Sequence, residues 1–261
     1  MDCSPKNLLE LDCSLRFIGV VRSEIQDRKL MPAFGVPARV EIFPEFAGGL
    51  LHLDKHSHFW VLAWLTVKPE RDLLQVTPRG AAEGDLHGVF AVRSPARPNP
   101  IGLTAARLLR REGLALYFDR LDFLDGTPVV DLKPYFVTRD LIRCANNAVI
   151  GRPRDEAALL ESLRHQAALA LPENHADVDL AVQIVYRYRV VHSNLGEPAE
   201  WNVVAPSDRP YLIDALLALT HTRFSRGFSL WAEAAVCLNG ERFALPHGPR
   251  SFSVGVDDGR A

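Results

Sequence analysis

The stretch Phe90-Ala-Val-Arg-Ser-Pro-Ala-Arg-Pro-Asn-Pro-Ile-Gly102 holds three prolines within six residues, Pro95 to Pro100. Proline fixes φ and donates no backbone hydrogen bond, and it pushes the residue before it into an extended conformation. The stretch is therefore predicted to be a stiff, extended loop, neither a helix nor a central strand. Two interpretations remain open. Arg93, Ser94, Arg97 and Asn99 form a clamp for an anionic ligand, or the loop is a rigid connector with solvated arginines.

Working outward from this loop, the sequence predicts short strands on both sides. The segment Leu103–Leu109 is ambiguous, because its alanines and leucines favour a helix while the turn and strand that follow favour a hairpin. With it, about eight strands fall within roughly 120 residues, which is typical of a small closed barrel or a sandwich. The other predicted strands are Leu15–Ser23, Ala38–Phe43, His58–Thr66, Leu73–Val76, Gly88–Val92, Leu114–Asp122 and Val129–Tyr135.

The sequence pattern changes after Phe136, and Pro153 and Arg154 indicate a linker. The pattern beyond it predicts helices over Glu156–Leu171 and Arg209–Thr222, a long strand over Val178–His192, and a hairpin with its turn at Asn239-Gly240. We therefore expect an all-β N-terminal domain, residues 15–140, and a smaller α+β C-terminal domain, residues 155–246. A leader, residues 1–14, and a tail, residues 247–261, are expected at the two ends.

Composition sets limits on the class of protein. The 261 residues are 48% apolar and 24% charged, with a formal net charge of −2, which is typical of a globular protein and argues against a strongly basic nucleic-acid binder. The four cysteines form no C-x-x-C pair, so neither a disulfide framework nor a cysteine zinc site is expected, and a reducing cytoplasm is the expected setting. The acidic N-terminus does not resemble a signal peptide, and the longest apolar run is too short to cross a membrane.

Familiar nucleotide and hydrolase motifs are absent from the sequence. There is no G-x-G-x-x-G after a strand, no P-loop and no G-x-S-x-G. His52, His56 and His58 have metal-like chemistry but no familiar hydrolase spacing, so no metal is expected. The alternation Tyr186-Arg-Tyr-Arg189 predicts a basic strand face that either contacts RNA phosphate or is merely solvated.

A second candidate site lies on the strand after the turn Asp125-Gly-Thr-Pro128. Strand alternation places Asp131, Lys133 and Tyr135 on one face, and Val130 and Leu132 on the other. An acid, an amine and a phenol together offer hydrogen bonds and proton transfer. The alternative is an exposed strand face with a weak Asp–Lys ion pair.

These motifs together closely resemble the TsaA-like family, also known as TrmO or YaeB. The resemblance covers roughly Leu15–Phe136 and rests on five stretches that occur in the family's order. The stretches are Ile18-Gly-Val-Val-Arg-Ser23, Phe34-Gly-Val-Pro37, Ser57-His-Phe-Trp60, Arg93–Leu103 and Leu121-Asp-Phe-Leu-Asp-Gly-Thr-Pro-Val-Val-Asp-Leu-Lys-Pro-Tyr135.

The resemblance implies a single-sheeted β-barrel, usually a homodimer, that binds S-adenosylmethionine without a Rossmann sheet. Characterised members look like tRNA methyltransferases, which N6-methylate threonylcarbamoyladenosine next to the anticodon. Residues carried over by the resemblance then line the methyl-donor site, while Arg97 and Asn99 meet the tRNA or complete the pocket. The donor-site residues are Ala38, Arg39, Val40, Leu65, Thr66, Arg93, Leu103, Asp125, Gly126, Thr127 and Pro128. Of these, Leu65 and Thr66 depart from the family, since they stand where its members often have a Phe-His pair.

Methyl transfer from a sulfonium needs in-line approach and exclusion of water more than strong acid–base help. The nitrogen attached to a carbonyl is weakly basic, so Asp131, Lys133 or Tyr135 is expected to help remove its proton. Two alternatives stay open. One is methyl transfer to another RNA or a small molecule, and the other is a non-catalytic RNA-binding barrel.

Overall fold

The computed structural model describes residues 14–66, 73–78, 81–142, 145, 152–171 and 174–245. It divides into two compact units, the first within residues 1–77 and 86–146 and the second within 78–85 and 147–261. The expected tail and all but the last residue of the expected leader lie outside the described residues.

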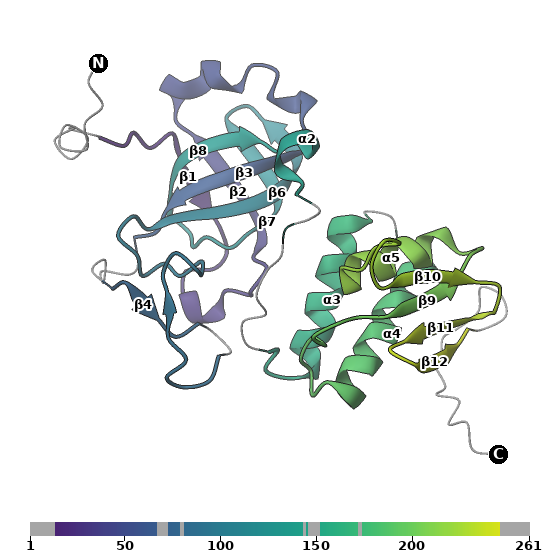
Figure 1. The fold of residues 1–261 in the computed structure, drawn as a ribbon. Coiled ribbons are helices and arrows are strands. Elements are labelled where there is room, and N and C mark those ends of the chain that lie inside the picture. Colours follow the sequence, from purple (N-terminus) through teal and green to yellow (C-terminus); the bar gives the residue numbers. More distant parts are fainter. Residues whose placement is uncertain are drawn as a thin grey trace, which may run out of the picture. The chain divides into compact units, whose positions relative to one another are not determined.

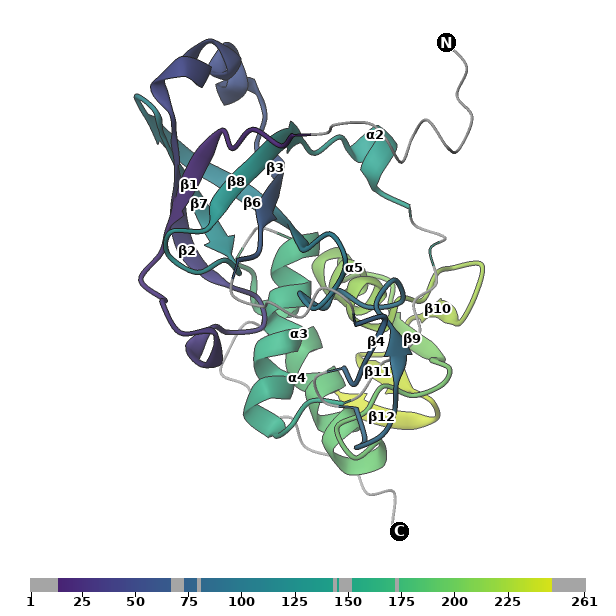
Figure 2. The ribbon, with the colours of Figure 1, turned by 90° about the vertical axis from the view of Figure 1, so that its left-hand side faces the viewer.

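The first unit is a closed antiparallel barrel in the strand order β1-β2-β7-β6-β3-β8 (Figures 1 and 2). The expected all-β barrel is confirmed. Six of the predicted strands form the closed barrel. The strands β4 and β5 lie outside it and pair with each other in a separate two-stranded sheet. The strands are β1 (Gly19–Arg22), β2 (Val36–Ile42), β3 (His58–Trp64), β4 (Gln75–Val76), β5 (His87–Gly88), β6 (Ile101–Glu112), β7 (Ala115–Leu121) and β8 (Pro128–Pro134).

Alternation along β3 shows how the barrel core forms. Phe59, Val61 and Ala63 are buried inside the barrel, while the residues between them are half-buried on its outer side. The ambiguous segment Leu103–Leu109 is a strand, since β6 pairs with β3 over Ile101–Arg107 and with β7 from Leu108 onward. The pairing that a barrel requires thus overrides the helix propensity of its alanines and leucines.

Two expectations within the first unit are wrong. The strand predicted over Gly88–Val92 ends at Gly88, because the chain turns there and Ala91 N donates to Gly88 O. The prediction that Val130 shares a face with Leu132 is also wrong. The pairing of β8 with β3 shifts register between Asp131 and Val129. As a result Val129, and not Val130, packs in the core together with Leu132.

Short helices occupy the connections of the first unit. The 3₁₀ helices are η1 (Arg28–Leu30), η2 (Pro44–Leu50) and η3 (Leu53–Lys55), and the α-helix α2 (Val137–Asp140) follows β8. The helices η2 and η3 both lie in the connection between β2 and β3, where Pro44 opens the first of them.

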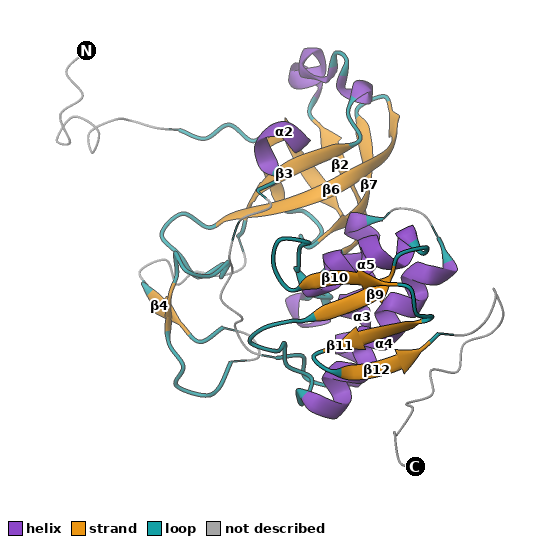
Figure 3. Cartoon of the chain, turned by 45° about the vertical axis from the view of Figure 1, so that its right-hand side comes forward, coloured by secondary structure: helices purple, strands orange, loops and turns teal. Residues whose placement is uncertain are grey.

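The second unit is a four-stranded sheet in the order β10-β9-β11-β12, with helices covering one face (Figure 3). The expected smaller α+β domain is confirmed as a fold. Its elements are α3 (Glu156–Ala170), α4 (Ala176–His192), β9 (Val203–Pro206), α5 (Pro210–Thr220), β10 (Phe228–Trp231), β11 (Ala235–Leu238) and β12 (Glu241–Ala244). The hairpin predicted around Asn239-Gly240 joins β11 to β12.

The strand predicted over Val178–His192 is wrong, because this segment is helix α4. Leu180, Ile184 and Tyr188 recur at intervals of four and are buried against the other helices and the sheet. The supposed basic strand face is therefore wrong as well. Within α4 the Arg189 guanidinium is buried and donates to the carbonyls of Leu195 and Gly196.

Candidate functional site

The barrel has two ends, which we name after a residue at each. At the Pro100 end β1 finishes at Arg22, β3 finishes at Trp64, and β6 and β8 begin. At the Arg111 end β6 finishes, β7 begins and β3 begins. Because the strands are antiparallel, the expected donor-site segments before β8, after β3 and before β6 all lie at the Pro100 end.

The proline loop is fixed to the barrel at this end. Pro100 O accepts from Leu65 N at 2.8 Å, and Ser94 Oγ accepts from Ala96 N at 3.2 Å. The Arg97 guanidinium donates back to the carbonyls of Val89, at 2.5 Å, and Val92, at 3.3 Å. In this structure Arg97 therefore braces its own loop, so its charge is not directed at a ligand.

Arg93 and Asn99 differ from Arg97. Both are exposed, and neither side chain bonds or ion-pairs with another described residue. A guanidinium suits the carboxylate of an amino acid or a phosphate, and an amide both donates and accepts hydrogen bonds. On this loop, the side chains of Arg93 and Asn99 thus remain available to bind a ligand.

Packing around Gly102 joins the loop to the end of β3. A Cβ at Gly102 would lie 2.5 Å from the Phe123 ring and 3.0 Å from Leu65 Cδ2. Only glycine lets Leu65 and Phe123 pack here. Thr66, the next residue, is exposed at the same end.

The turn Asp125–Pro128 is held against β1. Gly126 has φ of 78° and donates its N–H to Val21 O, and Val21 N donates to Thr127 O. Asp125 Oδ1 accepts from Ser23 N at 3.2 Å, and Thr127 is 5% exposed with its hydroxyl donating to Leu124 O. These two side chains shape the turn, and the backbone N–H groups of Asp125, Gly126 and Thr127 are all bonded within the protein, so that Gly126 is the one exposed residue of the turn.

The segment Ala38–Val40 belongs to β2, next to β1. The side chains of Ala38 and Val40 are buried in the core, whereas Arg39 is on the outer side. There Arg22 and Arg39 both donate to the Glu41 carboxylate and hold its pKa below its ordinary value.

The outer face of β3 brings Leu103 and Asp131 into one row. Leu62 pairs with Leu103 of β6 on one side and with Asp131 of β8 on the other. Directly opposed residues share a face and lie about 5 Å apart between Cβ atoms. Leu103 and Asp131 are therefore about 10 Å apart across Leu62, within reach of one ligand.

Lys133 pairs with Asp131 on this face, which is what the alternative interpretation of an exposed strand face with an Asp–Lys ion pair expected. Its Nζ lies 2.6 Å from Asp131 Oδ2, and this hydrogen bond raises the pKa of Lys133 above its ordinary value. The ammonium therefore stays protonated at neutral pH and does not act as a base.

Tyr135 lies at the Arg111 end. Its N–H donates to His58 O at the start of β3, and its ring packs 5.5 Å from the Trp60 ring. A strand rises about 3.3 Å per residue, so Tyr135 is about 23 Å along β8 from Pro128. The structure thus sets Tyr135 apart from the ion-paired Asp131 and Lys133, and Asp131 is the nearest of the three to the donor-site segments.

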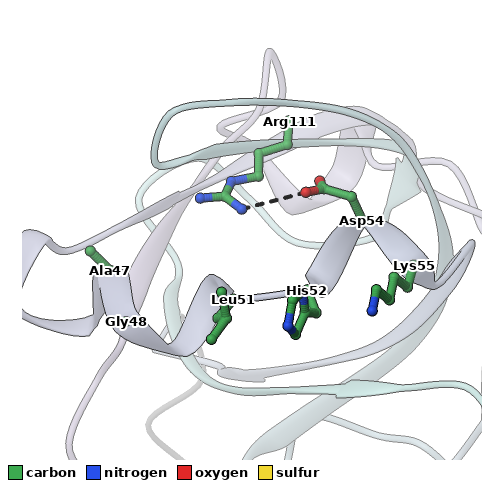
Figure 4. Close-up of a pocket in the computed structure, with 7 residues that line it drawn as sticks. All are labelled: Ala47, Gly48, Leu51, His52, Asp54, Lys55 and Arg111. Atoms are coloured by element: carbon green, nitrogen blue, oxygen red, sulfur yellow. Dashed lines mark ion pairs between the residues drawn. The ribbon is translucent and has the colours of Figure 1, made fainter.

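A surface cavity of about 580 Å³ lies at the Arg111 end (Figure 4). Arg111 donates to Leu50 O and Gly113 O and ion-pairs with Asp54. The cavity is lined by Ala47, Gly48, Leu51, His52, Asp54, Lys55 and Arg111. None of the residues expected to hold the donor is among them, so we assign no role to it.

The three histidines near this end do not converge. His52 lines the cavity, the His56 ring packs against Phe59 and Phe136, and His58 bonds with Ser57 Oγ. Within the part of the chain that the structure describes, no group of three or more His, Cys, Asp or Glu side chains is placed to hold a metal ion.

Sequence reasoning missed three features of the first unit. They are Phe123, which packs where Gly102 lacks a side chain, the Arg22–Glu41–Arg39 network, and the exposed ring of Phe90 on the segment that leads into the proline loop. Arg39 and Glu41 are two residues apart in a predicted strand and so share one face, which is the sequence pattern that could have predicted the network.

Comparison with known proteins places this geometry in a family. The profile of the tRNA-methyltransferase O N-terminal domain matches residues 20–141. A protein of Methanothermobacter thermautotrophicus, named a probable S-adenosyl-L-methionine-binding protein, is 42% identical over 131 residues, which are 49% of this chain and 93% of that protein. The chain belongs to the TsaA-like family. The matched range contains every expected site residue of this TsaA-like chain.

Other relatives match the same part of the TsaA-like chain. A probable S-adenosyl-L-methionine-binding protein of Archaeoglobus fulgidus is 45% identical over 52% of this chain but only 37% of its own length. A tRNA (adenine(37)-N6)-methyltransferase of Mus musculus is 39% identical over 39% of this chain and 24% of its own. A crystal structure of TrmO from Pseudomonas aeruginosa aligns with 91% of this chain and 95% of its own, at 21% identity and a TM-score of 0.45.

Among the described residues, no helix combines the length and the apolar character that crossing a bilayer requires.

Proposed function

We propose that this chain is an S-adenosylmethionine-dependent tRNA methyltransferase that N6-methylates threonylcarbamoyladenosine next to the anticodon. The observation that carries the proposal is the family match over residues 20–141, which contains both the proline loop and the Asp131 strand. The relatives' names supply the donor and the tRNA, and the finer substrate comes from the family resemblance in the sequence.

The Pro100 end offers groups that fit the donor. We assign Arg93 to the donor's carboxylate, the exposed Gly126 of the turn to its polar groups, and Leu65 and Leu103 to its apolar surface. Arg39 has its charge engaged by Glu41, so we assign it the role of supporting β1 beside the turn.

The reaction needs the donor and the nitrogen held in line with water excluded. The bound donor supplies an activated methyl group on sulfur. As the methyl carbon leaves sulfur and bonds to nitrogen, that nitrogen must lose its proton. Asp131 accepts this proton, because Lys133 is already protonated and Tyr135 lies at the other end of the barrel.

We further propose that the enzyme is a cytoplasmic homodimer. The outer row of β3 and β6 carries Trp60, Leu62 and Ala105, an apolar face beside the Leu103 that we assign to the donor. Such a face on a barrel surface favours a second apolar surface over water. Sedimentation of the purified chain should give twice its monomer mass of 29.0 kDa, and a monomer at micromolar concentration would contradict the dimer.

The activity is tested by incubating the chain with S-adenosylmethionine and tRNA from cells that lack this methylation. The digested nucleosides are then weighed by mass spectrometry. We expect threonylcarbamoyladenosine to gain one methyl group. A donor-binding protein that leaves this nucleoside unchanged contradicts the proposed substrate, and loss of donor binding as well contradicts the enzyme class.

A further inference from the structure

Phe90 is exposed on the segment that leads into the proline loop, and no role above uses it. Its side chain is 82% exposed, whereas that of Val89, immediately before it, is 1% exposed. Gly88 precedes the pair, and Ala91 N donates to Gly88 O to close a tight turn. The chain therefore directs one apolar side chain inward and the adjacent aromatic ring outward at the tip of a turn.

This turn is braced from both sides. The Arg97 guanidinium donates to the carbonyls of Val89 and Val92, which flank Phe90. Val89 N also donates to Leu74 O, which ties the start of the turn to its neighbouring segment. Hydrogen bonds from a charged donor are stronger than neutral ones, so the outward position of the ring is fixed before any ligand binds.

The braced turn is continuous with the proposed donor site. Arg97 is three residues from Pro100, whose carbonyl accepts from Leu65 N. Three residues span at most about 11 Å, so the segment that holds Phe90 is also the segment that meets the donor-site end of β3.

The groups around Phe90 match an unpaired nucleobase. An aromatic ring stacks on any base, and unstacked bases of RNA loops are recognised in this way. Asn99, on the same loop, is exposed and has an unpaired amide for a base edge. A surface that contacts a second copy of the chain favours apolar neighbours instead, as on the outer row of β3 and β6.

We infer that Phe90 is the stacking platform for an unpaired base of the RNA substrate beside the reacting adenosine, with Arg97 as its positioning residue. This inference rests on the proposed function, because it takes its ligand to be a tRNA anticodon loop.

The test measures binding of an anticodon stem–loop RNA to the full chain by fluorescence anisotropy. Phe90→Ala should weaken binding between about fivefold and about a hundredfold, the range measured for loss of one stacked base. Phe90→Trp should bind as well as the wild type. Leu51→Ala, which removes a 76% exposed side chain at the Arg111 end, should change nothing. Donor binding by calorimetry should be equal in all four proteins.

Arg97 is tested in the same assay. Arg97→Ala should weaken RNA binding in the wild-type background and have no further effect in the Phe90→Ala background, because it acts through the ring. Equal losses in both backgrounds would overturn its positioning role.

Other outcomes separate this inference from the proposed function. If the wild type methylates tRNA and Phe90→Ala binds and methylates equally well, the stacking role is wrong and the function stands. If the wild type binds the stem–loop in a Phe90-dependent way but methylates nothing, the function is wrong and the stacking role stands. A Phe90→Ala protein that sediments as a monomer while the wild type is a dimer assigns the ring to the dimer contact and overturns the inference.

Discussion

The two ends of the barrel differ in how they use their polar groups. The Arg111 end has the cavity of about 580 Å³, but the Arg111 guanidinium there is engaged with Leu50, Gly113 and Asp54. At the Pro100 end, main-chain hydrogen bonds hold the loops together, and Arg93 and Asn99 remain available. Our proposed site therefore rests on the unpaired polar groups of the Pro100 end and not on the cavity of the Arg111 end.

The largest effect that separates the two ends is expected on β8. Asp131→Asn should lower kcat by about a hundredfold or more, the usual contribution of a general base, with donor affinity unchanged. Tyr135→Phe should leave kcat near the wild-type value, because Tyr135 lies at the Arg111 end. Single-turnover methylation with saturating donor measures both, and a larger loss for Tyr135→Phe than for Asp131→Asn would reverse the assignment.

The arginines give a second contrast. Arg93→Ala should weaken donor binding by about tenfold or more, as expected for loss of a charge-assisted hydrogen bond, with little change in stability. Arg111→Ala should lower the free energy of unfolding by about 1 kcal/mol or more, because it leaves the carbonyls of Leu50 and Gly113 without this donor, and donor binding should not change. Calorimetry and urea unfolding of the same two proteins measure these effects.

Glycines at the two ends give a third, smaller contrast. Gly102→Ala forces its new Cβ against Phe123 and Leu65 and should lower the free energy of unfolding by about 1–3 kcal/mol. Gly48→Ala, at the Arg111 end, has no atom within 4 Å of the new Cβ and should be neutral or slightly stabilising. Equal urea midpoints for both variants would show that the Gly102 contact is not tight.

The sequence supported the barrel better than the second unit, and the reason is physical. The β3 alternation and the proline loop are local patterns that the barrel uses directly. In α4 the run Val182–Val190 is rich in β-branched and aromatic residues, which favour a strand locally. The segment is nevertheless a helix, because Leu180, Ile184 and Tyr188 all pack against one core. Their spacing of four residues is the sequence pattern that indicates this helix.

Residue types at the site were also easier to predict than their partners. The sequence identified Arg93, Arg97 and Asn99 as polar side chains on one loop. Only the structure shows that the Arg97 guanidinium donates hydrogen bonds to the carbonyls of Val89 and Val92. Likewise, strand alternation placed Asp131, Lys133 and Tyr135 on one face correctly. It did not show that the face extends from the middle of the barrel to its Arg111 end.

The smallest expected effect concerns His58, at the start of β3. Burial lowers the pKa of His58 below its ordinary value, with Arg107 and Arg120 also lowering it and Asp119 raising it. The unfolded chain therefore binds this proton more readily, so the stability is fully present above about pH 6.5 and falls as the pH drops below that value. His58→Gln should remove this part of the acid sensitivity, which urea unfolding at neutral and mildly acidic pH measures. If both proteins lose equal stability on acidification, His58 does not contribute, and the acid sensitivity of the barrel must arise from carboxylates such as Glu41, whose pKa is lowered by Arg22 and Arg39.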